Sequence, residues 1–298
     1  MKALSDFLLY VVLVSLPFSF AIGAEEGVDE EEFSQQELAM YLLMGSFDWM
    51  KEGQHVLPHS NVQLDLPPGY LMITGKDAQT FSQLVSVDAA EQVEAVVFHE
   101  NFESYIFFLF NDRGFVSLDG WDEIDSNALL EAISRHIDKT SVQMKEAGIP
   151  PVRVKEWKQQ PQLDRDARNV TMAITLQDIE DASCAYCSYG IHLGRKGYLG
   201  LSWLTKEEQY NPSRNDLDII MKGLSFQEGD LYEDYEPGDT IADGSIAHVV
   251  ASIAGAEHAP PAGSLFLSSK FWASVIGGIV GVGYVMQKTR GGRAGPHE

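Results

Sequence analysis

An uncharged segment near the C-terminus, Phe271–Met286, places the strongest constraint on this chain. Sixteen residues in a helix extend about 24 Å, slightly less than the ~30 Å hydrocarbon core of a bilayer, and residues 265–267 add further apolar length. Trp272 and Tyr284 lie near its two ends, where interfacial aromatic side chains are common. A buried core helix is the alternative. The flanking charges and aromatic residues favour a membrane anchor.

The N-terminus has the features of an export signal. Lys2 precedes an apolar run, Phe7–Phe20, of signal-peptide length, and residues 21–24 supply small side chains for cleavage. Asp6 is atypical of the charged part of a signal, so an uncleaved anchor is the alternative. Because basic residues cluster at 288–293, after the C-terminal segment, we expect the main domain outside and the tail in the cytoplasm.

Within the C-terminal segment, Gly277 and Gly281 have the G-x-x-x-G spacing of associating membrane helices, which also arises often by chance.

The export signal and the C-terminal segment divide the chain into six parts. The expected organisation is a signal peptide at 1–24, an acidic spacer and amphipathic helix at 25–53, an exported domain at 54–256, a linker at 257–269, a transmembrane helix at 270–287 and a basic cytoplasmic tail at 288–298.

Acidic residues dominate the exported part. The formal charge of the chain is -23, and all but two of its 44 Asp and Glu residues fall within residues 25–263. Such a domain repels the phosphate backbone, so we expect no nucleic-acid partner. Solubility is the simplest role for this charge.

The pattern of apolar residues predicts an α+β fold, with mostly antiparallel sheets and helices on one face, plus one C-terminal transmembrane helix. Asp125 precedes an apolar helical repeat and is expected to cap it. Predicted strands cover residues 62–66, 71–73, 93–98, 104–110, 115–118, 152–157 (ended by Pro161), 170–176, 186–193, 198–204 and 224–226. Predicted helices cover residues 33–51, 76–84, 126–147, 206–222 and 241–254.

Four segments in order resemble signatures of one bacterial family. They are LPPGY at 66–70, GIPPVRVKEW at 148–157, LGRKGYL at 193–199 and GLSFQEGDLYEDYEPG at 223–238. Together they resemble the domain-of-unknown-function 2167 family over residues 45–255. The resemblance implies a bacterial inner-membrane anchor with the domain in the periplasm, and it implies no reaction. The acidic spacer and the cysteine pair depart from the family pattern.

The two cysteines, Cys184 and Cys187, have C-x-x-C spacing. A thioredoxin-type site needs the first cysteine at a helix N-terminus, whereas strand patterns flank this pair on both sides. In an oxidising compartment a local disulfide or two spare thiols is therefore the simpler interpretation, and redox catalysis is the alternative. Zinc would require two further ligands, and none is spaced nearby.

No other pattern singles out a chemical site. The sequence has no G-x-S-x-G elbow and no glycine-rich phosphate loop, so we assign no catalytic residue, no cofactor and no metal ligand. His192 with Arg195 and Lys196 forms a small basic group beside a tight turn, where turn geometry is the simpler explanation and anion binding the alternative.

The preferred hypothesis is a non-catalytic binding domain of the cell envelope with a protein partner. Its expected interaction surface surrounds Trp203, Tyr232 and Tyr235, aromatic residues in or beside loops, for which core packing is the alternative. The alternative function is an envelope enzyme, either a hydrolase with paired carboxylates or a thiol oxidoreductase that uses the cysteine pair.

Overall fold

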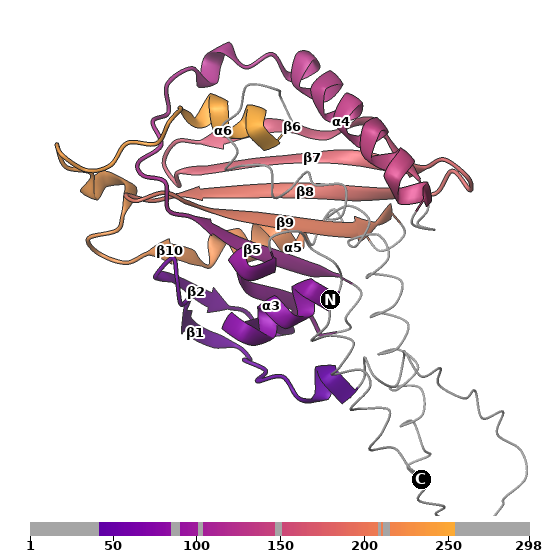
Figure 1. Cartoon of the computed structure of the whole chain (residues 1–298). Helices are drawn as coiled ribbons and strands as arrows, with labels where there is room; N and C mark the ends of the chain where they lie inside the picture. Colours follow the sequence, from indigo (N-terminus) through magenta and orange to yellow (C-terminus); the bar gives the residue numbers. More distant parts are fainter. Residues whose placement is uncertain are drawn as a thin grey trace, which may run out of the picture. The chain divides into compact units, whose positions relative to one another are not determined.

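A seven-stranded antiparallel sheet organises the domain (Figure 1). The computed structural model describes residues 42–84, 90–100, 104–146, 151–207, 210 and 215–253. The strand order is β3-β4-β5-β9-β8-β7-β6, and every neighbouring pair is antiparallel. The strands are β3 (Tyr70–Thr74), β4 (Val93–His99), β5 (Tyr105–Asn111), β6 (Val152–Asp164), β7 (Asn169–Asp178), β8 (Cys184–Leu193) and β9 (Tyr198–Lys206).

Three helices cover one face of this sheet. Alternate residues of the strands point to this face, and they pack with apolar side chains from the three helices into one core. Each helix contributes an almost fully buried side chain to this core, namely Phe81, Ile133 and Val250. The helices are α3 (Gly75–Leu84), α4 (Ser126–Glu146) and α6 (Ile246–Ile253); short 3-10 turns lie at η1 (Ala90–Gln92) and η2 (Trp121–Glu123).

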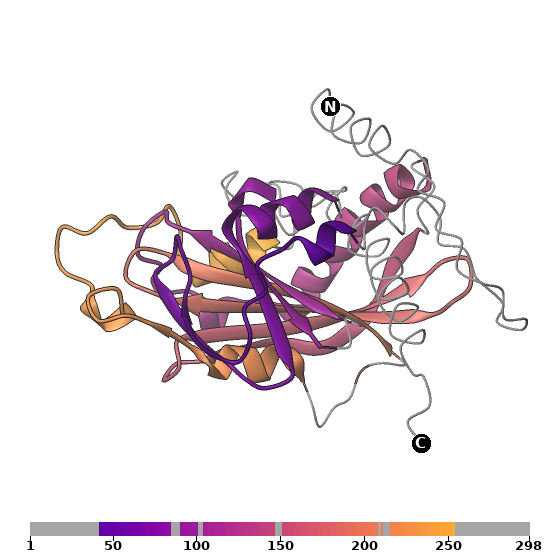
Figure 2. The same ribbon diagram turned by 90° about the horizontal axis from the view of Figure 1, so that it is seen from below.

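A smaller sheet and one helix cover the other face. The small sheet has the order β1-β2-β10, from β1 (Gly53–Val56), β2 (Val62–Leu66) and β10 (Leu224–Phe226). Together with α5 (Asp216–Lys222), it encloses a second core over β3, β4, β5 and β9. The view from below in Figure 2 shows the indigo β1–β2 hairpin in front of the large sheet. The predicted α+β class with antiparallel sheets is confirmed, but α5 lies on the face opposite the other helices.

Local sequence explains the best-predicted elements. The run YIFFLF at residues 105–110 is almost continuously apolar because the central strand β5 is covered on both faces. Asp125 caps α4 as predicted, because its Oδ1 accepts hydrogen bonds from the amides of Asn127 (2.9 Å) and Ala128 (3.2 Å).

Two strand predictions need correction. Residues 115–118 form no strand; Phe115 makes only an isolated parallel bridge with Ile241, so it connects a loop to another loop. Pro161 does not end β6, which continues to Asp164. Pro161 is tolerated because β6 is an edge strand and its register with β7 shifts between Gln159 and Gln162, around the residue that lacks an N–H.

The predicted helices at 76–84 and 126–147 closely match α3 and α4, whereas those at 206–222 and 241–254 were predicted to begin earlier than α5 and α6 do, and Lys206 belongs to β9. The last helix begins at Ile246 rather than 241, because the preceding residues form a loop hydrogen-bonded to residues 115–117. In the predicted helix at 33–51, the structure describes helix only at 42–45. The side chains of Met44 and Phe47 nevertheless enter the first core, so this segment docks on the domain.

Several predictions fall on residues outside the described ranges. These include the signal peptide, the acidic spacer, the linker, the transmembrane helix at 270–287 with its Gly277 and Gly281, and the basic tail. Among the helices that the structure does describe, none combines the length and apolar character needed to cross a membrane.

Candidate functional site

The tight turn between β8 and β9 is the base of the candidate site. Gly194 and Gly197 close it through a hydrogen bond from the Gly194 amide to the Gly197 carbonyl (2.8 Å). Gly197 is pressed against the end of β5, and a Cβ added there would lie 1.8 Å from the Asn111 carbonyl oxygen. Only glycine fits, so the two basic residues between the glycines are held in a fixed position.

Arg195 joins this turn to a loop more than thirty residues later in the chain. Its Nε and Nη2 donate to the two carboxylate oxygens of Asp239, at 2.7 and 2.9 Å, and its Nη1 donates to the Gly229 carbonyl at 3.3 Å. This is the planar, two-point geometry that a guanidinium and a carboxylate adopt when both are well placed. The hydrogen bonds from Arg195 lower the pKa of Asp239, and the same contact raises the pKa of Arg195.

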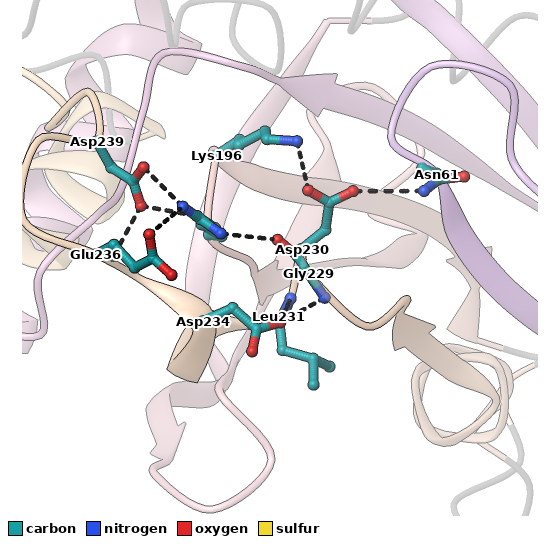
Figure 3. A network of polar contacts seen from close by, with 9 residues as sticks. Asn61, Lys196, Gly229, Asp230, Leu231, Asp234, Glu236 and Asp239 are labelled. Atoms are coloured by element: carbon teal, nitrogen blue, oxygen red, sulfur yellow. Dashed lines mark hydrogen bonds and ion pairs between the residues drawn. The ribbon is translucent and has the colours of Figure 1, made fainter.

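Lys196 makes a second connection from the same turn (Figure 3). Its Nζ lies 2.6 Å from Oδ1 of Asp230, and the other oxygen of that carboxylate accepts from Asn61 Nδ2 at 3.4 Å. The hydrogen bond from Lys196 lowers the pKa of Asp230. Because Asn61 lies in the β1–β2 turn, this contact ties the small sheet to the loop and to the large sheet.

We call residues 227–241 the clasped loop. Inside it, Asp234 accepts hydrogen bonds from the amides of Gly229 (2.8 Å) and Leu231 (2.9 Å) across the short turn η4 (Tyr232–Asp234). Asp239 accepts from the Glu236 amide at 2.9 Å in addition to Arg195. The carboxylates of the loop therefore hold its backbone as well as its partners in the turn (Figure 3).

Aromatic packing fixes the middle of the clasped loop. The rings of Tyr232 and Tyr235 lie 4.6 and 4.2 Å from the Phe115 ring, and the Tyr232 hydroxyl donates to the Val116 carbonyl (3.1 Å). Arg168 lies over the Tyr232 ring at 5.0 Å and pairs with Glu233 at 2.6 Å. The loop, at the left in Figure 1, is thus held by charge pairs and by stacked rings.

Two large apolar side chains remain exposed on this rigid segment. Leu231 is 37% exposed and Ile241 is 60% exposed. Loops held in place by a scaffold and carrying apolar side chains are typical binding surfaces, because little conformational entropy is lost when a partner binds.

The expected aromatic surface is only partly present. Tyr232 and Tyr235 lie half-buried in the clasped loop, but Trp203 is 2% exposed and belongs to the second core, so it cannot contact a partner. Trp203 lies in β9, and its position on the face covered by α5 explains its burial. The sequence placed it beside a loop because α5 could not be assigned to that face.

Cys184 and Cys187 both lie in β8, and both are free thiols. Residues three apart in a strand point to opposite faces and lie about 10 Å apart, beyond the ~7 Å reach of a disulfide. Cys187 is fully buried in the first core, and burial raises the pKa of its thiol to about 12. The geometry favours two separate thiols, and this pKa shift is opposite to that of a nucleophilic cysteine.

The small basic group of the turn is dispersed in the structure. Arg195 and Lys196 are engaged by carboxylates of the clasped loop. His192 is buried, stacks on Phe226 (ring centroids 5.1 Å apart) and contacts Asn169 through Nδ1. Burial lowers the pKa of His192 to about 4, so its ring is neutral. Turn geometry and packing explain all three residues.

Sequence reasoning did not identify the acidic partners of this turn. It assigned no role to Asp230, Asp234 or Asp239, of which Asp230 and Asp239 pair with the turn. A signal was present: two of the family-like segments, at 193–199 and 223–238, carry opposite charges. Pairing them requires knowing that the turn and the loop meet in space.

Among the described residues, no group of three or more His, Cys, Asp and Glu side chains is arranged to hold a metal ion.

The fold and these contacts define an α+β domain with antiparallel sheets, in which the β8–β9 turn is ion-paired to an acidic loop that is distant in sequence. The chain belongs to the family described as "Protein of unknown function (DUF2167)", whose model matches residues 50–283. The predicted family is therefore confirmed. No curated protein matches the chain.

One solved structure with some similarity is the solution structure of cyanobacterial PsbP (CyanoP) from Synechocystis sp. PCC 6803. It is 9% identical and covers 69% of this chain and 99% of that chain, with a TM-score of 0.37. A score this low supports no argument about function.

Proposed function

We propose that this chain is a non-catalytic binding protein of the bacterial cell envelope. In this proposal the C-terminal segment anchors the protein in the inner membrane as a single pass, with the main domain in the periplasm and the C-terminus in the cytoplasm. The domain binds an envelope protein partner through the clasped loop.

The observation that carries the proposal is the rigid presentation of Leu231 and Ile241. The loop that holds them is fixed by two Asp carboxylates, Asp230 and Asp239, paired to the β8–β9 turn. The clasped loop therefore presents two solvent-exposed apolar side chains on a backbone fixed by charge pairs, which is the arrangement expected of a preformed binding surface. The thiol oxidoreductase alternative gains no support, because the two cysteines are free thiols and Cys187 is deeply buried.

The proposal is tested by site-specific photo-crosslinking in intact cells. A photoreactive amino acid replaces Leu231 or Ile241 in the full-length chain, and Ile179, which is 53% exposed in the turn after β7, provides the matched control. We expect one adduct of the same mass from both loop positions and none from Ile179. The yield should fall when Arg195→Gln is added, because the loop loses its two-point contact with Asp239.

Adducts at the loop positions no more abundant than those at Ile179 would argue against a partner surface there. Equal crosslinking yields with and without Arg195→Gln would show that binding does not depend on the contact between Arg195 and Asp239.

A further inference from the structure

A small pocket of about 200 Å³ lies next to the clasped loop. It is lined by the end of β5, the start of β9, the residues that close the loop, and α6. Its outer wall is rigid, because the Phe115 amide donates to the Thr240 carbonyl (2.8 Å) and the Ala242 amide donates to the Phe115 carbonyl (2.9 Å). Gly114 allows this close contact, since a Cβ there would lie 2.5 Å from the Thr240 oxygen. The pocket is therefore preformed.

Tyr198, which lines the pocket, supplies a hydrogen-bond donor. Tyr198 is 6% exposed, and its hydroxyl oxygen accepts from Asn111 Nδ2 at 3.2 Å. The hydroxyl donates no hydrogen bond to any residue that the structure describes. Burial raises the pKa of Tyr198 to about 12, so the hydroxyl keeps this proton and remains a donor.

Arg113 supplies positive charge at the same pocket. Its guanidinium forms no ion pair with any described residue, although the surrounding domain is strongly acidic. Its charge acts on the Tyr198 hydroxyl, where it opposes the effect of burial on the pKa. Both residues line the pocket, where an arginine fork and a hydroxyl could both contact one oxyanion.

We infer that this pocket binds the C-terminal carboxylate of a peptide segment of the partner, held by Arg113 and Tyr198 beside the exposed Ile241. This inference deepens the proposed function and depends on it for the identity of the partner as a protein.

The charge of the pocket favours a singly charged group. Asp243 lines the same pocket, and together with the acidic domain it would repel a phosphate dianion more strongly than a carboxylate. The exposed side chain of Ile241 also lines the pocket and offers apolar contact to the residue that carries the carboxylate. A free small carboxylate would gain nothing from that apolar contact.

Fluorescence anisotropy on the detergent-solubilised full-length chain tests this assignment. The probe is a dye-labelled octapeptide pool, randomised at its first six positions and ending in Leu-Val, with a free α-carboxylate or with a C-terminal amide. We expect the acid to bind at least about tenfold more tightly than the amide, as for loss of one charge-assisted contact. Arg113→Gln should abolish this preference, and Tyr198→Phe should reduce it about three- to tenfold.

Arg153→Gln is the matched control, because Arg153 is an exposed arginine on β6 that contacts only Gln177 among the described residues. It should leave the preference unchanged. Equal binding of acid and amide, binding of neither, or a preference that survives Arg113→Gln would overturn the inference. Competition by free propionate as strong as that by the peptide acid would assign the pocket to small carboxylates instead. These outcomes leave the crosslinks from Leu231 unaffected, so the inference and the proposed function fail separately.

Discussion

Gly197→Ala is expected to destabilise the domain by at least about 3 kcal/mol, which is large for a single methyl group. The added Cβ would lie 1.8 Å from the Asn111 carbonyl oxygen and 2.8 Å from its carbon, and both are backbone atoms at the end of a central strand. Neither can retreat without disturbing β5. The turn would have to move instead, and Arg195 and Lys196 would lose their alignment with the clasped loop.

A second glycine provides the control for this prediction. Gly229 has φ +92, but its added Cβ meets nothing within 4 Å, so Gly229→Ala should cost only the backbone strain of about 1–2 kcal/mol. Urea unfolding of both full-length variants, followed by near-UV circular dichroism, measures the difference. Similar midpoints for the two variants would mean that the turn is not pressed against β5 in solution.

Trp203→Ala is the second large effect, with an expected loss of about 3–5 kcal/mol in the free energy of unfolding. The side chain is 2% exposed in the second core, and its removal leaves a cavity between the large sheet and α5. Its Nε1–H has no hydrogen-bond partner among the described residues. Trp203→Phe should therefore cost much less, because no buried acceptor is left unpaired.

The same unfolding experiment distinguishes core from surface. Leu231→Ala removes a partly exposed side chain and should change the free energy of unfolding by less than about 1 kcal/mol. The same substitution should weaken crosslinking to the partner from the photoreactive residue at position 241. A Trp203→Ala variant that unfolds at the same urea concentration as the parent would place the indole at the surface, as the sequence alone suggested.

The periodicity of apolar residues correctly predicted those elements that have the same environment along their whole length. The strand at 170–176 alternates because one face of β7 meets the helices, and Asp125 caps α4 through contacts two and three residues away. Residues 115–118 look equally strand-like, but in the structure they meet a loop from the far end of the chain instead of a neighbouring strand. Pattern alone cannot distinguish these two partners.

The candidate site was harder to predict because its contacts are distant in sequence. Arg195 and Asp239 are separated by 44 residues, and Asn61 and Asp230 by 169. Because the sequence contains many acidic residues, its composition could not identify the few carboxylates that have specific partners. Trp203 was misplaced for a related reason, since only the packing of α5 on the second face buries it.

Amide hydrogen exchange across the clasped loop is the most direct test of the account. We predict that the amides of Gly229, Leu231 and Glu236 are protected in the full-length protein, because each donates to a carboxylate of the loop. Arg195→Gln should raise exchange at these amides while β7 and β8 stay unchanged, and Arg153→Gln should have no effect. Rapid exchange of the loop in the parent protein, or protection that persists in Arg195→Gln, would contradict a binding surface preformed by the clasp.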